Sequence, residues 1–262
     1  MNNVIITQLK NQSGRMLDWI LYHWTEGFDT FIIYDDHSED NTLNEIEQIK
    51  NKYGINIFVF KTEEIGRVYN IDDCRNSESY SGDRNLSLRI FKSYLKSNNF
   101  VKEQNPDAIC AVIDVDEFLV TNENRKVSET IREIILEMNV EQLVINSFDI
   151  LDKYEIKDWY TSDNQTSLRW DFNSVIKDGT YKNRYKSIII SKYFDNCESP
   201  HILRWSNDPI VNGKNLIDSF RIFDFDKLRI HHFRKPNLNS NIEFSEDNIL
   251  INKMKIIKDK YE

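Results

Sequence analysis

The fold of this chain is indicated most directly by the segment Ala108-Ile-Cys-Ala-Val-Ile-Asp-Val-Asp-Glu-Phe-Leu-Val120. Its six leading, mostly apolar residues have the length and composition of a buried strand. Side chains alternate along a strand, so we expect Asp114 and Asp116 to project to the same side. Two carboxylates at the end of a buried strand repel each other and lose hydration, which is costly unless a cation compensates. The alternative is an acidic strand end that is solvated at the surface.

A hard divalent cation is the simplest compensation for these carboxylates. Mg²⁺ and Mn²⁺ prefer carboxylate oxygens, and they usually keep coordination positions that phosphate oxygens can fill. The segment therefore predicts a metal–diphosphate site around Asp114 and Asp116.

Upstream of this segment, strand and helix signals alternate. The expected strands are 4–9, 31–34, 55–60 and the run that leads to Asp114, and the expected helices are 13–26, 40–53 and 83–95. Ser13 and either Asp40 or Asn41 are candidate N-caps, and Gly27 and Gly54 are candidate helix stops. This order predicts an α/β fold with a mostly parallel sheet and helices on both faces.

Polar clusters follow three of the expected strands. They are Thr7-Gln8, Asp35-Asp36 and the pair Asp114 and Asp116. Ligands of parallel sheets bind beyond the carboxyl ends of the strands, so the coincidence favours a metal–nucleotide site. The polar segment 61–82 is long for a connection inside one domain, and we interpret it as a functional loop.

The second half of the chain is less regular. The expected elements are a helix at 128–138 and strands at 142–145, 185–192, 201–205, 219–223 and 228–233. We find no repeat and no linker, and we expect one domain over residues 1–262. Residues 1–120 form its nucleotide-binding half, residues 121–240 an elaborated second half, and residues 241–262 a C-terminal helix.

Composition narrows the function classes. The net charge is −9 and the pI is about 5.2, which disfavours nonspecific nucleic-acid binding. The three cysteines are far apart, so a structural zinc site is not expected. With no signal peptide and no long apolar run, we expect a cytoplasmic protein. The amphipathic, locally basic segment 248–261 packs on its own domain or makes a peripheral contact with the inner membrane.

Four segments together resemble nucleotide-sugar glycosyltransferases of the GT-A fold, most closely the family-2-like group that includes glycosyltransferase family 92. They are Lys10-Asn11 with Leu17-Asp-Trp-Ile-Leu-Tyr-His-Trp24, the segment Phe28 to Asp40, Ile113-Asp-Val-Asp-Glu-Phe-Leu119, and Ile230-His-His-Phe-Arg-Lys235. The resemblance implies that Asp116 ligates Mn²⁺ or Mg²⁺ on the donor diphosphate and that Asp114 contacts the donor ribose or the metal. It also implies that His232 completes the metal shell.

The same resemblance implies a nucleotide site on the first strands. Asp36 would bind uracil or ribose with Thr7 beside it, and Arg84 would reach the nucleotide or its diphosphate. Lys186 and His201 match a segment that shapes the donor pocket. For each of these residues an ordinary structural role is the alternative. Asp36 would make an Asx turn, Arg84 would form a surface ion pair, and His232 would be a hydrogen-bonded core or surface residue.

The catalytic base is the least determined assignment. An inverting transfer needs a carboxylate that takes the proton of the acceptor hydroxyl. Asp149 is the first candidate, and Asp152, Glu155 and Asp171 are its rivals. The surrounding segment Asn146-Ser-Phe-Asp-Ile150 lacks the glycine-rich turn that is frequent in the family, which leaves the acceptor open.

The resemblance implies a metal-dependent, inverting glycosyltransferase that uses a UDP-sugar as donor and a glycan hydroxyl as acceptor in surface polysaccharide synthesis. A sugar nucleotidyltransferase is the first alternative, although Leu9 to Gly14 is a poor version of its glycine-rich loop. An aspartyl phosphatase is disfavoured because its D-x-D motif is expected on the first strand. A non-catalytic relative that binds a sugar or a protein is the third alternative.

Overall fold

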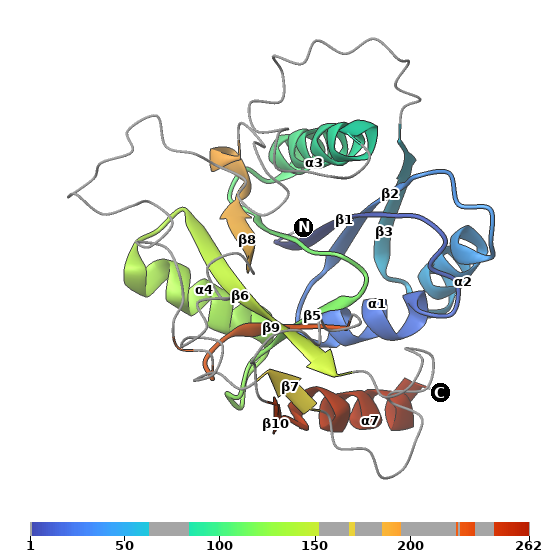
Figure 1. Cartoon of the computed structure of the whole chain (residues 1–262). Helices are drawn as coiled ribbons and strands as arrows, with labels where there is room; N and C mark the ends of the chain where they lie inside the picture. Colours follow the sequence, from blue (N-terminus) through green and yellow to red (C-terminus); the bar gives the residue numbers. More distant parts are fainter. Residues whose placement is uncertain are drawn as a thin grey trace.

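The computed structural model of the chain describes residues 2–62, 84–151, 168–170, 185–194, 224, 226–233 and 244–261 (Figure 1). Within these ranges the side chains of 84–88, 151, 168–170 and 244–246 are not described. The expected strands at 201–205 and 219–223 lie outside the described residues, as does most of the polar segment 61–82.

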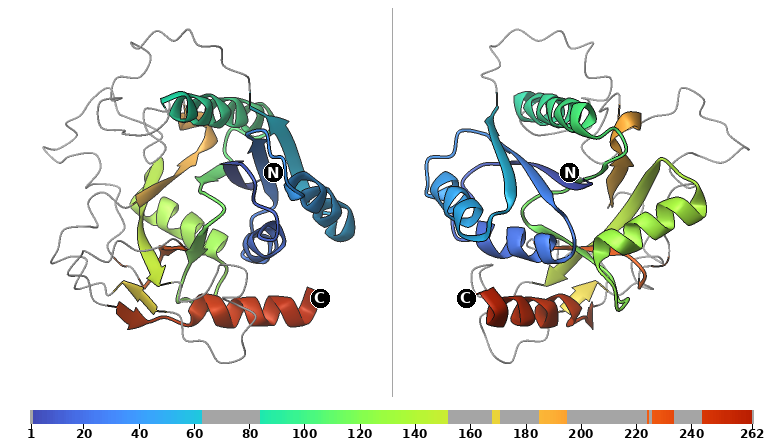
Figure 2. Two further views of the ribbon diagram at one scale, coloured as in Figure 1. Left: turned by 45° about the vertical axis from the view of Figure 1, so that its right-hand side comes forward. Right: turned by 180° about the vertical axis from the view of Figure 1, so that it is seen from behind.

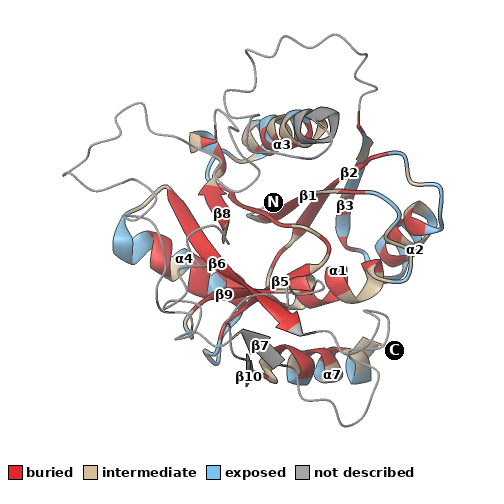
Figure 3. Cartoon of the chain, in the orientation of Figure 1, coloured by how far each residue is buried: buried red, intermediate tan, exposed pale blue. Residues whose placement is uncertain are grey.

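The first half of the chain forms a parallel sheet. Its strands are β1 (Asn3–Leu9), β2 (Thr30–Asp35), β3 (Asn56–Lys61) and β4 (Ile109–Val112), in the order β4-β1-β2-β3. All three pairings are parallel. The strands β1, β2 and β4 are buried on both faces, as their continuous apolar runs predict (Figure 3). The predicted parallel α/β arrangement is confirmed for this half.

Helices cover both faces of this sheet (Figure 2). The helices α1 (Met16–Thr25) and α2 (Thr42–Tyr53) pack on the face that carries Ile5 and Phe31. The helix α3 (Arg84–Gln104) packs on the opposite face, against Val4 and Ile6. Because side chains alternate along a strand, consecutive apolar residues of β1 serve two separate cores.

The second half extends the sheet with antiparallel strands. Its elements are β5 (Glu117–Val120), α4 (Val127–Met138), β6 (Gln142–Leu151), β7 (Leu168–Trp170), β8 (Tyr185–Ile190), the 3-10 turn η4 (Ser191–Tyr193), β9 (Arg229–His232), β10 (Phe244–Glu246) and α7 (Ile249–Tyr261). Strand β8 lies antiparallel between β4 and β6, and β9 lies between β5 and β6. Strand β6 runs well beyond the predicted end at residue 145 because it pairs in turn with β8, β9 and β7.

Local signals at the helix ends are partly wrong. Ser13 does not cap α1, because the N-cap residue is Arg15. The Ser13 hydroxyl instead donates to Glu45 Oε1 at 2.5 Å. The α2 start uses Asp40, which accepts a hydrogen bond from the Thr42 backbone N–H at 3.0 Å. Gly27 ends α1 as predicted, with φ at 93°, and a Cβ there would lie 2.0 Å from Ser128 Oγ. Only glycine fits this position.

The C-terminal helix α7 packs on its own domain. Its buried side chains are Leu250, Ile251, Met254 and Ile257, and the ring of Tyr261 lies 5.6 Å from that of Trp24 in α1. The expected packing is thus confirmed, and a peripheral membrane contact is not supported because the apolar side of the helix is covered. Among the described residues, no helix has the length and apolar character needed to cross a bilayer.

Candidate functional site

The carboxyl ends of β1 and β4 lie at the topological switch point of the sheet. From β1 the chain runs through α1 to β2 on one side, whereas α3 leads to β4 on the other side. Open α/β sheets bind their ligands at such a point. The Thr7 hydroxyl and the Gln8 side-chain carbonyl lie there at the end of β1, buried and without a hydrogen-bond partner among the described residues. Unsatisfied buried polar atoms are costly, and Gln8, which is partly exposed, is suited to a polar ligand.

The acidic motif does not continue the strand as expected. Strand β4 ends at Val112, and the chain turns through residues 113–116 before β5 begins at Glu117. The Glu117 backbone N–H donates to the Asp114 carbonyl at 3.0 Å, and the Asp114 N–H donates to Glu117 Oε2 at 2.9 Å. Because of this turn, Asp114 and Asp116 meet different partners.

Asp114 is compensated by a lysine. Lys186 of β8 places Nζ 2.6 Å from Asp114 Oδ2 and 3.3 Å from Glu117 Oε2. Burial alone would lower the pKa of Lys186, but the two carboxylates outweigh it and raise that pKa well above its ordinary value. Burial raises the pKa of the Glu117 carboxyl to about 7, although Lys186 acts in the opposite direction. The cation that Asp114 requires is therefore an ammonium group of the chain itself.

Asp116 faces His232 of β9. Its Oδ2 lies 3.4 Å from His232 Nε2, while His232 Nδ1 lies 3.5 Å from Asp149 Oδ1. The Phe233 N–H also donates to the Asp116 carbonyl at 2.8 Å, which ties the turn to the end of β9. Burial tends to lower the pKa of His232, but the Asp116 hydrogen bond and the charges of Glu117, Asp116 and Asp149 raise it to about 9.

The Asp116–His232 pair fits a divalent cation. Two neighbouring ligands about 2.1 Å from one ion and about 90° apart are about 3 Å from each other, close to the 3.4 Å that separates these two atoms. Across the described residues, no group of three or more His, Cys, Asp or Glu side chains is arranged to hold a metal. Mg²⁺ at phosphate sites typically takes one or two carboxylates and completes its shell with water and phosphate oxygens. Asp114, engaged by Lys186, is less suited to be a metal ligand.

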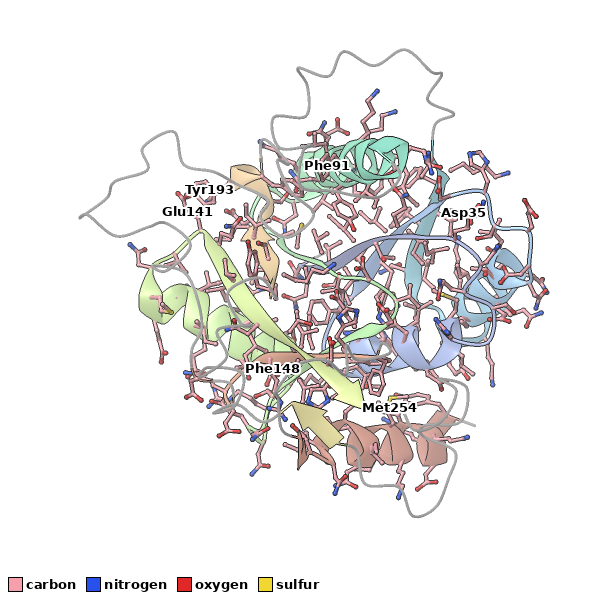
Figure 4. The ribbon with its side chains drawn as sticks, in the orientation of Figure 1. Asp35, Phe91, Glu141, Phe148, Tyr193 and Met254 are labelled. Carbon is pink, nitrogen blue, oxygen red and sulfur yellow. The ribbon has the colours of Figure 1, made fainter. Side chains whose placement is uncertain are left out.

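Asp36 is held by an arginine that the sequence did not single out. Arg89 of α3 donates to both carboxylate oxygens, at 2.8 and 2.9 Å, and the Thr62 hydroxyl donates to Oδ1 at 2.6 Å. Burial opposes the effect, but these partners hold the pKa of Asp36 below its ordinary value. The preceding Asp35 accepts hydrogen bonds from the Ser38 N–H at 3.1 and 3.2 Å (Figure 4). Arg84 is the first residue of α3, and its side chain lies outside the described part of the structure.

The aromatic residues of α1 support the site by holding β5. Trp19 Nε1 donates to the Glu117 carbonyl at 2.9 Å and the Tyr22 hydroxyl donates to the Leu119 carbonyl at 2.8 Å, so α1 fixes β5. His23 is fully buried among aromatic rings, and burial lowers its pKa to about 3. Trp19, Tyr22 and His23 thus all belong to the core.

Asp149 is fully buried at the site, and the rival bases Asp152, Glu155 and Asp171 lie outside the described residues, as does His201. Cys110 is a core residue of β4, as expected. Phe148, which precedes Asp149 in β6, lies beside His231 of β9 in the sheet register (Figure 4).

No protein-family model matches the chain, and no curated protein matches it. Among solved structures, S. aureus TarS 1–349 in complex with UDP is similar at 13% identity and a TM-score of 0.40, over 74% of this chain and 48% of TarS 1–349. Glucosyl-3-phosphoglycerate synthase from Mycobacterium tuberculosis is similar at 9% identity and a TM-score of 0.34, over 74% and 58% of the two chains. A putative glucose-1-phosphate thymidylyltransferase from Bacillus anthracis is similar at 8% identity and a TM-score of 0.40, over 98% and 96%.

The chain thus spans about half of the TarS structure that it matches. These three are a protein in complex with UDP, a synthase and a putative thymidylyltransferase, and none of them points to glycosyltransferase family 92 in particular. With TM-scores below 0.5, a function has to be argued from the residues of the site.

Proposed function

We propose that this chain is a metal-dependent, inverting glycosyltransferase that moves a sugar from a UDP-sugar to a hydroxyl of a surface glycan. The observation that carries the proposal is the Asp116–His232 pair, 3.4 Å apart just beyond the switch point of the sheet. Both side chains keep some solvent exposure, 31% for Asp116 and 13% for His232, so a ligand can reach them. A carboxylate and an imidazole at the switch point of such a sheet are suited to a metal that carries a diphosphate.

Asp116 and His232 would hold the ion. A bound Mg²⁺ or Mn²⁺ would supply positive charge where the leaving diphosphate becomes more negative. Asp114 would then serve the nucleotide. Lys186 holds one of its oxygens at 2.6 Å, yet the side chain is 45% exposed and can accept hydrogen bonds from ribose hydroxyls.

The nucleotide would be bound along β1 and β2. Gln8 at the end of β1 is partly exposed and suits a base or ribose edge, whereas Thr7 is 0% exposed and is assigned to the core. Since Arg89 and Thr62 engage both oxygens of Asp36, we assign Asp36 to orienting α3 rather than to touching the nucleotide. Arg84, at the start of α3, would meet the diphosphate.

The acceptor hydroxyl must lose a proton to a base within hydrogen-bond reach. Because Asp149 has no exposed surface, Asp152, Glu155 and Asp171 are the better candidates for that base. We therefore propose that the base comes from the segment that follows β6.

Thermal unfolding with UDP, GDP, CMP and dTDP tests the proposal, each nucleotide being added with Mn²⁺ or with EDTA. A ligand that binds only the folded state at 100 times its Kd stabilises that state by about 2.7 kcal/mol. We expect UDP to raise Tm in Mn²⁺ and to do so far less in EDTA, and we expect Asp116→Asn to lose this difference. If no nucleotide changes Tm in Mn²⁺, the proposed function is wrong. A response to nucleoside triphosphates alone would favour a nucleotidyltransferase.

A further inference from the structure

Asp149 contacts His232, one member of the Asp116–His232 pair, on the buried side of the imidazole. His232 presents Nε2 to Asp116, which is 31% exposed, and Nδ1 to Asp149, which is 0% exposed. The imidazole therefore lies between a partly exposed carboxylate and a buried one. The buried carboxylate, Asp149, is on β6, and the exposed one, Asp116, is in the turn that follows β4.

This burial separates Asp149 from the acceptor. A general base must come within about 3 Å of the proton-bearing oxygen or act through one water. A carboxylate without accessible surface meets neither requirement in this conformation. Its Oδ1 instead lies 3.5 Å from a ring nitrogen of His232.

The backbone sets the spacing between the two residues. Asp149 and His232 are register partners in the parallel pair β6–β9, so the sheet hydrogen bonds fix the separation of their Cα atoms. On the other side, β5 pairs with β9 so that Glu117 is opposite His232. The Phe233 N–H holds the Asp116 carbonyl at 2.8 Å. The three side chains are therefore brought together by secondary structure before any ligand binds.

We propose that Asp149 is a positioning residue, which orients the His232 imidazole so that Nε2 is presented to the metal shared with Asp116. A carboxylate that accepts the Nδ1–H fixes both the tautomer and the ring plane of a histidine, and it makes Nε2 a better metal ligand. This inference rests on the proposed function, and it replaces the role of base for Asp149.

The neighbouring histidine offers a matched control. His231 points to the other side of β9, where its Nε2 lies 3.2 Å from the buried carboxylate of Asp247. Asp149→Asn and Asp247→Asn each remove the charge of a buried carboxylate beside a β9 histidine. Only the first of these carboxylates contacts a proposed metal ligand.

The test measures binding of Mn²⁺ alone, without nucleotide, by electron paramagnetic resonance of the wild type and both variants. We expect Asp149→Asn to weaken Mn²⁺ binding by about tenfold or more, and Asp247→Asn to leave the affinity of the folded protein unchanged. Thermal unfolding checks that each variant folds, and Asp149→Ser is the substitute should Asp149→Asn not fold.

A spectroscopic readout separates orientation from a general loss of structure. In histidine labelled with ¹⁵N and with Mg²⁺ as the diamagnetic ion, we expect His232 of the wild type to carry its proton on Nδ1, and Asp149→Asn to shift the tautomer balance. Wild-type Mn²⁺ affinity together with an unchanged tautomer in Asp149→Asn would overturn the inference alone. A wild-type protein that binds no Mn²⁺ would overturn the proposed function and the inference with it.

Discussion

His231 and His232 are adjacent in β9 but have opposite environments. His231 is fully buried, and Arg229 Nε donates to its Nε2 at 3.0 Å while Asp247 lies 3.2 Å away. Arg229 also donates to Asp247 at 2.6 Å and to Asn122 at 2.6 Å. His232 lies between Asp116 and Asp149 and keeps partial exposure toward Asp116.

The difference distinguishes a structural charge network from a site. Around His231 the chain supplies both the cation and the anion, Arg229 and Asp247 are buried, and the network joins β9 to the residues before α7. Around His232 the described partners include the carboxylates of Asp116 and Asp149, and Asp116 remains accessible. A site that leaves charge open to solvent can accept a ligand, whereas a closed network mainly fixes the fold.

The largest effect is expected in the buried charge network around His231. Asp247→Ala leaves the Arg229 guanidinium, 1% exposed, without its carboxylate partner. Removing one member of a buried ion pair typically costs about 3 to 5 kcal/mol. We expect a loss of this order in the free energy of unfolding in urea. A loss below about 1 kcal/mol would contradict the structural role of this network.

Around His232, the free energy of unfolding should depend on pH through the titration of this histidine. In the folded protein its pKa is about 9, against an ordinary value of 6.5, because its carboxylate partners outweigh the effect of burial. A raised folded-state pKa means that the contribution is complete below pH 6.5 and is lost as pH rises through 9. The shift corresponds to about 3 kcal/mol.

Urea unfolding in EDTA between pH 6 and pH 9.5 measures this loss. The variant His232→Gln is the control, since it lacks the titrating group, and its profile should be flatter than that of the wild type over this interval. Parallel profiles for the two proteins would argue against a charged His232 between Asp116 and Asp149.

A smaller effect is expected at Asp114, which the proposed function assigns to the nucleotide and not to the metal. Lys186→Met removes the ammonium that holds Asp114 at 2.6 Å, while among the described residues the ion pairs of Lys186 are with Asp114 and Glu117 and not with the Asp116–His232 pair. Loss of a hydrogen bond to a charged group is worth about 1.5 kcal/mol or more, which is about tenfold in affinity. UDP binding in Mn²⁺ should therefore weaken about tenfold, with Mn²⁺ binding alone unchanged. Equal losses in both would show that Lys186 supports the whole site, and they would contradict a separate role of Asp114.

Local sequence patterns predict the frame of the site but not its partners. The apolar runs of β1, β2 and β4 and the helical spacing of α1 identify the parallel sheet, so the carboxyl end of β4 was correctly expected to carry acidic residues. The turn at residues 113–116 was missed because strand alternation assumes that the strand continues. The partners Lys186 and Arg89 lie 72 and 53 residues from Asp114 and Asp36, and no local period relates residues so far apart.

The two halves of the chain differ in the same respect. In the first half β1, β2 and β3 are each followed in chain order by a helix, and the periodicity of the sequence is enough to order these elements. In the second half β6 pairs with three strands in succession, which depends on segments distant in sequence. The lysine next to the apolar run Ile188 to Ile190 is a local signal that such a partner is needed, because buried lysines are rare unless paired.

The central claim is that Asp116 and His232 form an open metal–diphosphate site. Isothermal titration of UDP into the wild type and into Asp116→Ala, each with Mn²⁺ and with EDTA, tests it most directly. We expect binding to the wild type in Mn²⁺, and loss of that binding both in EDTA and in a folded Asp116→Ala. Wild-type affinity for UDP in Asp116→Ala with Mn²⁺ would contradict the claim.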